Sequence, residues 1–188
     1  MLTKMENLNI LKDFIESILK IKVLEIIERP YLNQIYLPKE ENFGVIDVRV
    51  ITEDMKEVNV GIQFINGYYI ENKILLYYAQ IHSKQIEYSS HNSITKTVTI
   101  NILNSSYFYT NECHSVFNLK SNNDDVLEDN MIEIHVLELP KFKTTKINSK
   151  EEAWISFIKG DDILRKECDE IKKFDYILEK YWKSEMIE

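Results

Sequence analysis

Two β-rich runs joined by a short, mostly polar segment constrain the fold of this chain more than any other feature of its sequence. Residues 44–51 (GVIDVRVI) and 57–65 (EVNVGIQFI) are rich in valine and isoleucine, and only residues 52–56 separate them. Such a pattern predicts a β-hairpin. A single acidic residue, Asp47, lies in the middle of the first arm.

A long helix is predicted directly after the hairpin. Residues 68–88 carry apolar side chains at the spacing of one helical face, namely Ile70, Ile74, Tyr77, Tyr78 and Ile81. This stripe is typical of a helix that packs on a sheet. Near the beginning of the chain, residues 8–19 alternate apolar and charged positions in the same rhythm and predict an amphipathic helix.

The rest of the chain completes a sheet with helices. Further strands are predicted at residues 22–28, 95–103, 113–119 and 131–139, the last of which ends at Pro140. Ser149 and Glu152 have the spacing of a capping box, and a helical segment is predicted from there to about Ser184, with a break at Gly160. This order of elements indicates an α/β or α+β fold.

Length and charge narrow the class of protein. A chain of 188 residues with 44% hydrophobic residues suits one domain with a real core. We expect residues 1–148 to form that domain and residues 149–188 to be a helical extension of it. Because the net charge is −8 and only three residues are arginine, a generic basic binder of nucleic acid is excluded.

Asp47 is the first candidate for chemistry, because a carboxylate within an aliphatic strand is costly to bury unless it is paired or bound to a metal. Position 61 follows fourteen residues later across the hairpin, and Gln63 is two residues further on the same face. Carboxylates at 47 and 61 with a donor at 63 would form a Mg²⁺ site that activates water. Residue 61, however, is Gly61.

Several short motifs, taken in order, carry a resemblance to a known family. They are residues 44–48 (GVIDV), residues 58–63 (VNVGIQ), the helix with Lys73, Tyr77, Tyr78 and Gln85, and residues 138–142 (ELPKF). In this order they resemble the PD-(D/E)XK nuclease family transposases, also called recombination-promoting nucleases. The resemblance covers the chain from about Leu8 to Phe142.

The resemblance implies a restriction-endonuclease-like core, in which a mixed central β-sheet is flanked by helices. It also implies Mg²⁺-dependent cleavage of DNA by active members, with Mn²⁺ as a substitute. Asp47 matches the metal-binding Asp of the family, and Gln63 matches a position that would hold the attacking water. Gly61 stands where the family has its catalytic Glu, and Lys73 stands where an Arg is usual.

The glycine predicts impaired or absent cleavage, because loss of a catalytic carboxylate typically removes about 10²–10⁴ of the rate or more. Glu71, near the start of the second helix, is a candidate substitute acid, and Glu16 on the first helix is a weaker one. Relative to the family the chain also begins close to its first helix and ends early, so we expect a truncated or decayed copy.

Contacts with DNA would fall on Lys73 and on the basic cluster of Lys141, Lys143 and Lys146, although the pattern of this cluster favours a solvated loop over a DNA contact. The tyrosines of the second helix invite a base-stacking role, but their spacing predicts that most of them pack in or beside the core. The apolar positions within residues 163–182 could form an intramolecular face or the interface of a homodimer.

The remaining chemistry-bearing residues give little support to other sites. The two cysteines, Cys113 and Cys168, lack CxxC spacing, and no secretory leader opens the chain, so we expect a cytoplasmic protein. No apolar run approaches the roughly 20 residues of a membrane span. The histidines form no HExxH motif, and Cys113 and His114 would point to opposite faces of one strand.

Two functions remain open from the sequence. The first is a Mg²⁺-dependent DNA endonuclease of the recombination-promoting type, impaired by Gly61. The second is a catalytically dead nuclease-fold module that binds DNA or protein, or the remnant of a transposase. Within either, Asp47 could be structural, bonded to backbone or to Arg49, and Gln63 could be an ordinary satisfied strand residue.

Overall fold

Three α-helices, one short 3-10 helix and six strands make up the described part of the chain. In the computed structural model of the protein, the described residues are 8–28, 45–88, 94–119 and 131–160. The elements, in chain order, are α1 (Leu8–Leu19), β1 (Val23–Glu28), β2 (Val45–Thr52), β3 (Glu57–Ile65), α2 (Ile70–Tyr88), β4 (Lys96–Leu103), β5 (His114–Asn118), β6 (Ile132–Glu138), η4 (Leu139–Lys141) and α3 (Lys150–Lys159). Every predicted strand is confirmed to within one residue at either end.

The six strands form one sheet in the order β1-β2-β3-β4-β6-β5. Strand β2 runs antiparallel to both β1 and β3, whereas β3, β4 and β6 run parallel to one another. Strand β5 pairs antiparallel with β6 at the edge. The predicted α/β class with a mixed central sheet flanked by helices is therefore confirmed.

Strands β2 and β3 form the predicted hairpin. Its turn is closed by the backbone amide of Thr52, which donates to the carbonyl of Lys56 at 3.0 Å, and Met55 adopts a left-handed φ of 61° there. In the resulting register Asp47 lies directly opposite Gly61. Because directly opposed residues of an antiparallel pair point to the same face, these two positions share one side of the sheet.

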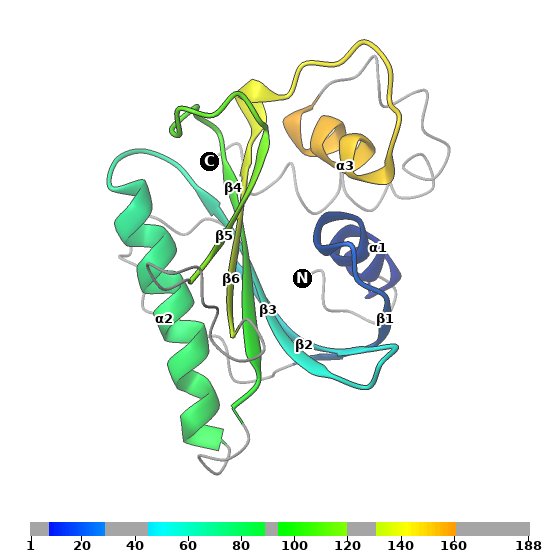
Figure 1. Ribbon diagram of the computed structural model, residues 1–188, viewed down its shortest axis with the longest axis vertical. Coiled ribbons are helices and arrows are strands. Elements are labelled where there is room, and N and C mark those ends of the chain that lie inside the picture. Colours follow the sequence, from blue (N-terminus) through cyan, green and yellow to red (C-terminus); the bar gives the residue numbers. More distant parts are fainter. Residues whose placement is uncertain (1–7, 29–44, 89–93, 120–130, 161–188) are drawn as a thin grey trace.

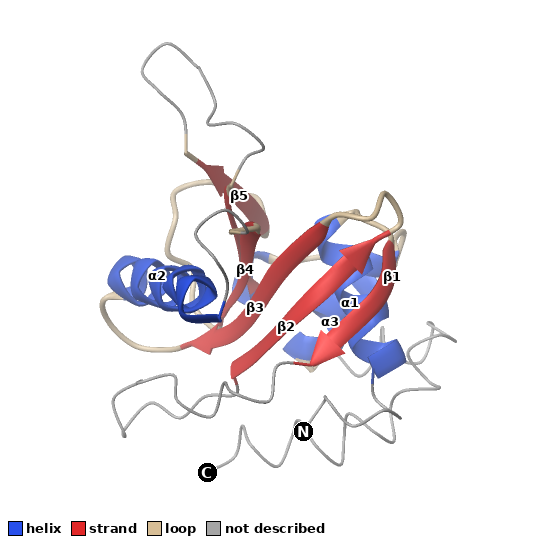
Figure 2. Ribbon diagram, turned by 90° about the horizontal axis from the view of Figure 1, so that it is seen from below, coloured by secondary structure: helices blue, strands red, loops and turns tan. Residues whose placement is uncertain are grey.

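Helices cover both faces of the sheet. Figure 1 shows α2 along one face, with α1 and α3 against the other. The same separation is visible from below in Figure 2, where α1 and α3 lie together behind β1 and β2. Alternate residues along each central strand therefore point toward α2 or toward α1 and α3.

The main core lies between the sheet and the α1/α3 layer. It contains Val48, Val60, Ile62, Val98 and Ile100 of the sheet, Ile10, Phe14 and Ile18 of α1, and Trp154 and Phe157 of α3. The Trp154 ring meets the edge of Phe14 at a centroid distance of 5.4 Å, and its indole nitrogen donates to the Asp13 carboxylate at 2.9 Å. This contact joins the two helices.

The ends of α3 confirm two sequence predictions. The Ser149 side chain caps the helix by accepting from the backbone amide of Glu152 at 3.1 Å. The Glu152 carboxylate in turn accepts from the amide of Asn148, one residue before the cap. Gly160 ends the helix in the left-handed conformation with φ 81°, which favours glycine.

Other predictions about the C-terminal region fall on residues that the structure does not describe. They include the helical continuation beyond Gly160, the apolar face within residues 163–182 and the position of Cys168. Among the described helices, none is both long and apolar enough to cross a bilayer.

Candidate active site

Asp47 is a buried carboxylate on the face of the sheet that α2 covers. Asp47 is 8% exposed, and its negative charge acts on the phenol of Tyr77 in α2. Two residues along the strand, Arg49 forms an ion pair with Glu57 across the hairpin at 3.1 Å. The structure thus keeps Asp47 beneath the helix, as the hairpin register predicts.

Gly61 is the residue directly opposite Asp47, and α2 lies against it. A Cβ atom at this position would lie 2.1 Å from Cδ1 of Ile81 and 2.9 Å from the hydroxyl oxygen of Tyr77. Real Cβ contacts essentially never fall below 3.0 Å. The space that a side chain at position 61 would need is therefore filled by two residues of the helix.

Tyr77 lies beside this pair and connects the helix to the hairpin. It is fully buried, and its hydroxyl lies 3.1 Å from the carbonyl oxygens of Ile46 in β2 and Ile62 in β3, to which it donates. Burial, and then the charge of Asp47, raise the pKa of Tyr77 well above its ordinary value. The phenol stays neutral at physiological pH and ties α2 to both arms of the hairpin.

Gln63 lies on the same face as Asp47 and is engaged within the sheet. It is 3% exposed, and its Nε2 donates to Oδ1 of Asn101 on β4 at 2.6 Å. Asn101 continues this hydrogen-bond network, because its Nδ2 donates to the backbone carbonyl of His135 and to the Thr99 hydroxyl. A neutral amide held in this way can position a neighbour but cannot act as a general base.

The structure does not bring Glu71 to Asp47. Glu71 is exposed in the first turn of α2, and it faces the hydroxyl of Tyr107 in the loop between β4 and β5. Burial and then the charge of Glu71 raise the pKa of Tyr107. Asp47 lies on β2, and β3 separates this strand from β4, which leads into the loop of Tyr107. Glu16, the weaker candidate, lies on the opposite side of the sheet and accepts from the amide of Val23 at 2.8 Å.

The comparisons with known proteins decide the family of this chain. A model of the PD-(D/E)XK nuclease family transposases matches residues 1–184. The chain belongs to this family. No curated protein and no solved structure matches it. Membership indicates a nuclease or transposase function directed at DNA, and the mixed sheet with flanking helices agrees with a restriction-endonuclease-like domain.

PD-(D/E)XK nucleases typically use a divalent metal, and the residues of this chain do not fit one well. At the site that the resemblance implies, Asp47 would supply one carboxylate, Gly61 has no side chain to offer as a ligand, and the amide of Gln63 is bonded to Asn101. Within residues 8–28, 45–88, 94–119 and 131–160, no group of three or more His, Cys, Asp or Glu side chains could hold a metal ion.

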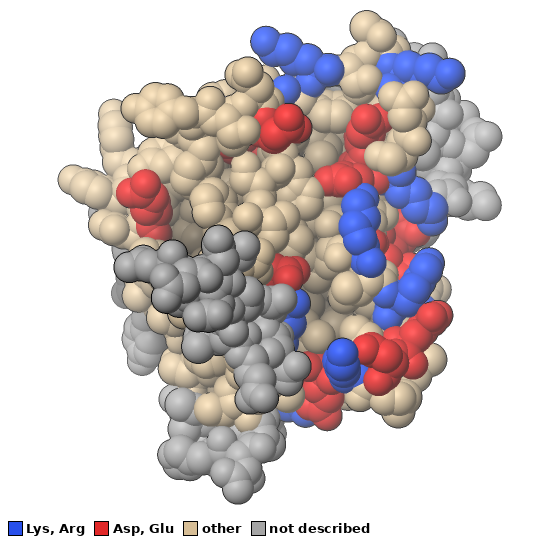
Figure 3. All heavy atoms as spheres, viewed as in Figure 1, with Lys and Arg blue, Asp and Glu red and all other residues tan. Residues whose placement is uncertain are grey.

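The lysines that sequence reasoning assigns to DNA differ in their surroundings. Lys73 Nζ donates to the carbonyl of Asn66 at 2.9 Å, and Lys141 forms a buried ion pair with Glu138 and donates to the carbonyl of Phe108. Lys143 is exposed. On the face drawn in Figure 3, lysines and arginines lie mostly among acidic side chains rather than in a separate basic patch.

The tyrosines around α2 divide into two pairs. Tyr77 and Tyr78 are buried, as the helical spacing predicts. Tyr68 and Tyr69 precede the helix and are 84% and 78% exposed. Tyr69 adopts a left-handed φ of 61°, a conformation that costs a non-glycine residue on the order of 1 kcal/mol. The turn therefore holds two aromatic rings in solvent.

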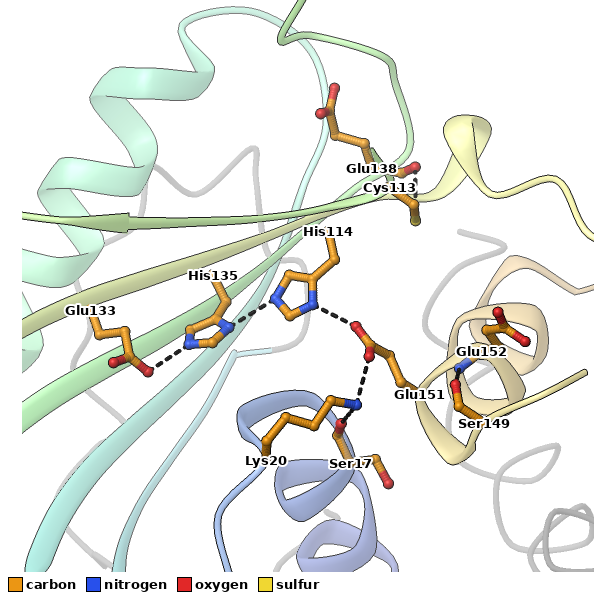
Figure 4. Close-up of polar contacts among 10 residues, drawn as sticks. All are labelled: Ser17, Lys20, Cys113, His114, Glu133, His135, Glu138, Ser149, Glu151 and Glu152. Atoms are coloured by element: carbon orange, nitrogen blue, oxygen red, sulfur yellow. Dashed lines mark hydrogen bonds and ion pairs between the residues drawn. The ribbon is translucent and has the colours of Figure 1, made fainter. Parts of the chain in front are cut away.

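Sequence reasoning missed a row of partly buried polar contacts on the other face of the sheet. Figure 4 shows Glu133, His135, His114 and Glu151 in one continuous row that leads from β6 through β5 to α3. The two histidines are 21 residues apart in sequence, so only the pairing of β5 with β6 brings them together. No local motif signals this contact.

Proposed function

We propose that this chain has lost efficient Mg²⁺-dependent cleavage and acts as a DNA-binding member of its nuclease family. One observation carries the proposal: Ile81 and Tyr77 occupy the space opposite Asp47 in which the catalytic Glu of the family would lie. The substitution by glycine and the packing of the helix are matched to each other. This is the arrangement expected of a site that no longer needs its acid.

The remaining groups support weak metal binding at most. Mg²⁺ can be held by one or two carboxylates together with substrate phosphates, and Mn²⁺ can take its place in such sites. With Asp47 as the only carboxylate, a bound metal ion would take most of its ligands from the DNA. Loss of the second carboxylate is expected to cost about 10²–10⁴ in rate.

The end of the sheet at which the parallel strands β3, β4 and β6 finish has features that suit contact with DNA. Ile65, Leu103 and Glu138 lie level across these strands, so the segments that follow them leave the sheet at the same end. These segments carry the exposed rings of Tyr68 and Tyr69, and also Tyr107, Tyr109 and the exposed Lys143. Exposed aromatic rings stack on unpaired bases with little sequence preference.

A plasmid-cleavage assay tests the loss of catalysis. Supercoiled plasmid is incubated with Mg²⁺, Mn²⁺ or EDTA and with four proteins: the unmodified chain, Ile81→Ala, Gly61→Glu with Ile81→Ala, and the latter with Asp47→Ala. Removing the Ile81 side chain makes room for the restored acid, which Gly61→Glu alone would lack. We expect nicking only with Gly61→Glu and Ile81→Ala together, and none once Asp47 is replaced.

The controls separate folding from chemistry. Ile81→Ala alone measures what the cavity does without an acid, and circular dichroism verifies that each variant is folded. Metal-dependent cleavage by the unmodified chain that disappears with Asp47→Ala would contradict the proposal. In that case Glu71 is the next acid to replace.

A binding assay tests the DNA contact independently of cleavage. Fluorescent single-stranded and double-stranded oligonucleotides are titrated with the unmodified chain in EDTA at low and moderate salt. We expect binding that weakens as salt rises and that falls when Tyr68 and Tyr69 are both replaced by alanine. Absence of DNA binding at low salt would contradict the proposed DNA contact and favour a nuclease-fold module that binds protein.

A further inference from the structure

A chain of short polar contacts crosses the α1/α3 face at the β5–β6 edge (Figure 4). Glu133 Oε1 lies 2.7 Å from Nε2 of His135, and Nδ1 of His135 lies 2.8 Å from Nε2 of His114. His114 Nδ1 then lies 2.5 Å from Oε1 of Glu151. Each imidazole thus uses its outer nitrogen for a carboxylate and its inner nitrogen for the other imidazole.

Lysines close both ends of this chain. Lys96 of β4 lies 2.7 Å from the Glu133 carboxylate, and Lys20 at the end of α1 lies 2.6 Å from that of Glu151. Lys20 also donates to the carbonyl of Ser17 at 2.7 Å. The charged groups facing the two imidazoles therefore come from β4, β6, α3 and α1, and the contacts join these elements through β5.

The hydrogen bonds fix the number of protons on the histidine pair. Ionised carboxylates only accept, so the outer nitrogens of His114 and His135 must both carry protons. A neutral imidazole has one proton, so two neutral rings would place two bare lone pairs 2.8 Å apart. Two charged rings would place two N–H groups against each other. Only one additional proton, shared between the inner nitrogens, makes the contact a hydrogen bond.

The neighbouring groups keep both carboxylates ionised and favour one of the two imidazole rings for the shared proton. Hydrogen bonds from the histidines, as the largest cause, lower the pKa of both Glu133 and Glu151 to about 2, so both remain acceptors. Burial lowers the pKa of His135, which is 4% exposed, so His135 is the less favourable ring for the additional proton. The neighbouring Cys113 stays neutral, because burial raises the pKa of its thiol to about 11.

We propose that His114 and His135 form a proton-binding site, in which one shared proton fastens α3 to the sheet through Glu151. With the proton bound, the charged histidine pair lies between two carboxylates and all three contacts along the row are attractive. Without it, the inner contact becomes repulsive and His114 loses its charge toward Glu151. A second proton also breaks the inner contact. Docking of α3 is therefore strongest while the pair holds one proton.

Nitrogen NMR of the imidazoles tests the proton count directly. In long-range ¹H–¹⁵N spectra of the ¹⁵N-labelled full chain at neutral pH, His114 should show two protonated nitrogens. His135 should show one protonated nitrogen, Nε2, and one acceptor nitrogen. Neutral spectra for both rings throughout pH 5–9, or two charged rings at neutral pH, would overturn the proposal.

Hydrogen exchange tests the consequence for α3. Protection factors of amides in residues 153–159, corrected for the intrinsic pH dependence of exchange, should fall about tenfold or more when the shared proton is lost at higher pH, because a charge-assisted hydrogen bond is lost. The Trp154 indole signal reports the same opening. His135→Gln should lower protection at neutral pH and remove this pH dependence.

Two further variants keep the test decisive. Should His135→Gln fail to fold, Glu151→Gln removes the anchor on α3 from the outside and should reduce the pH dependence in the same way. His82→Gln is the matched control, because His82 is a partly buried histidine of α2 that contacts Thr97 at 2.9 Å and lies on the other side of the sheet. If His82→Gln abolishes the pH dependence of α3, or if Glu151→Gln leaves it intact, the proposal is wrong.

Discussion

Both faces of the central sheet contain buried residues, but the two faces differ in chemistry. Toward α1 and α3, strands β2, β3 and β4 present valine and isoleucine. Toward α2 the same strands present the buried polar residues Asp47, Asn59, Gln63, Thr97, Thr99 and Asn101. Burial alone does not require this difference, because an aliphatic face would pack at least as well. The apolar face holds the fold together, whereas the polar face carries Asp47 and Gln63, the residues proposed for chemistry from the sequence.

The polar face is maintained by hydrogen bonds within it. Gln63 bonds to Asn101, and Gln85 of α2 reaches the hydroxyl of Thr97 at 2.7 Å. Such bonds offset the desolvation of the polar groups, so the face is tolerated without adding the stability of an aliphatic core. At position 61, directly opposite Asp47, the Ile81 side chain fills the space above the glycine.

The largest effect is expected on the apolar face. Trp154→Ala removes a ring that is 2% exposed, together with its contact to Phe14 and its bond to Asp13. We expect a loss of about 3–5 kcal/mol in the free energy of unfolding. For a chain of this size that corresponds to a fall of roughly 10 °C in the melting temperature.

Urea and thermal unfolding measure this change, with Leu75→Ala as the control, because Leu75 lies on the outer side of α2 and is 59% exposed. The control should change stability by less than about 0.5 kcal/mol. Similar losses for both variants would show that the main core does not lie between the sheet and α3.

On the polar face the sharpest test is Gly61→Ala. The added methyl group collides with the ends of Ile81 and Tyr77, so we expect a loss of about 1–3 kcal/mol from overpacking. A double-mutant cycle with Ile81→Ala measures the contact. The alanine at 61 should cost less, or even stabilise, once the Ile81 side chain is gone. An unchanged cost would mean that Ile81 is not what excludes a side chain here.

Much of the fold could be predicted because its signals are local. The valine-rich arms, Pro140 and the Ser149 cap each act within a few residues, and the hairpin placed Asp47 opposite Gly61 from chain spacing alone. The apolar stripe also predicted that α2 packs on the sheet. It could not show that Ile81 fills the space above Gly61, because that depends on how closely the helix packs on the sheet.

Contacts that depend on strand order were beyond reach of the sequence. His114 and His135 meet only because β5 turns back beside β6, and Glu151 joins them only after α3 docks. Helical spacing did not separate the exposed Tyr68 and Tyr69 from the buried tyrosines of α2. The structure does, since Tyr68 and Tyr69 belong to the turn before the helix. In each case the deciding information is tertiary.

A matched exchange of residues compares the two faces directly. Val60→Thr places a hydroxyl in the aliphatic core, where burial without a partner costs about 1–3 kcal/mol. Thr99→Val removes a hydroxyl from the polar face, where its recorded bond from Asn101 is long at 3.2 Å. We expect that change to cost less than about 1 kcal/mol. Equal losses in urea unfolding would remove the distinction between the faces.

The smallest effect concerns the one polar row on the apolar face. The hydrogen bond from His135, and further the contact with Lys96, lower the pKa of Glu133 to about 2 from an ordinary value of 4.5. A lowered pKa stabilises the fold above the unfolded value and loses that effect as the pH falls from about 4.5 toward 2. Glu133→Gln should therefore lower the melting temperature by about 2–4 °C at pH 6, allowing for partial exposure of the carboxylate. The difference from the unmodified chain should shrink steadily below pH 4.5, whereas Glu25→Gln on the exposed side of β1 should show little difference at any pH. A difference that persists undiminished at pH 3 would mean that Glu133 acts through packing rather than through its charge, and that this row of the apolar face is held together by shape alone.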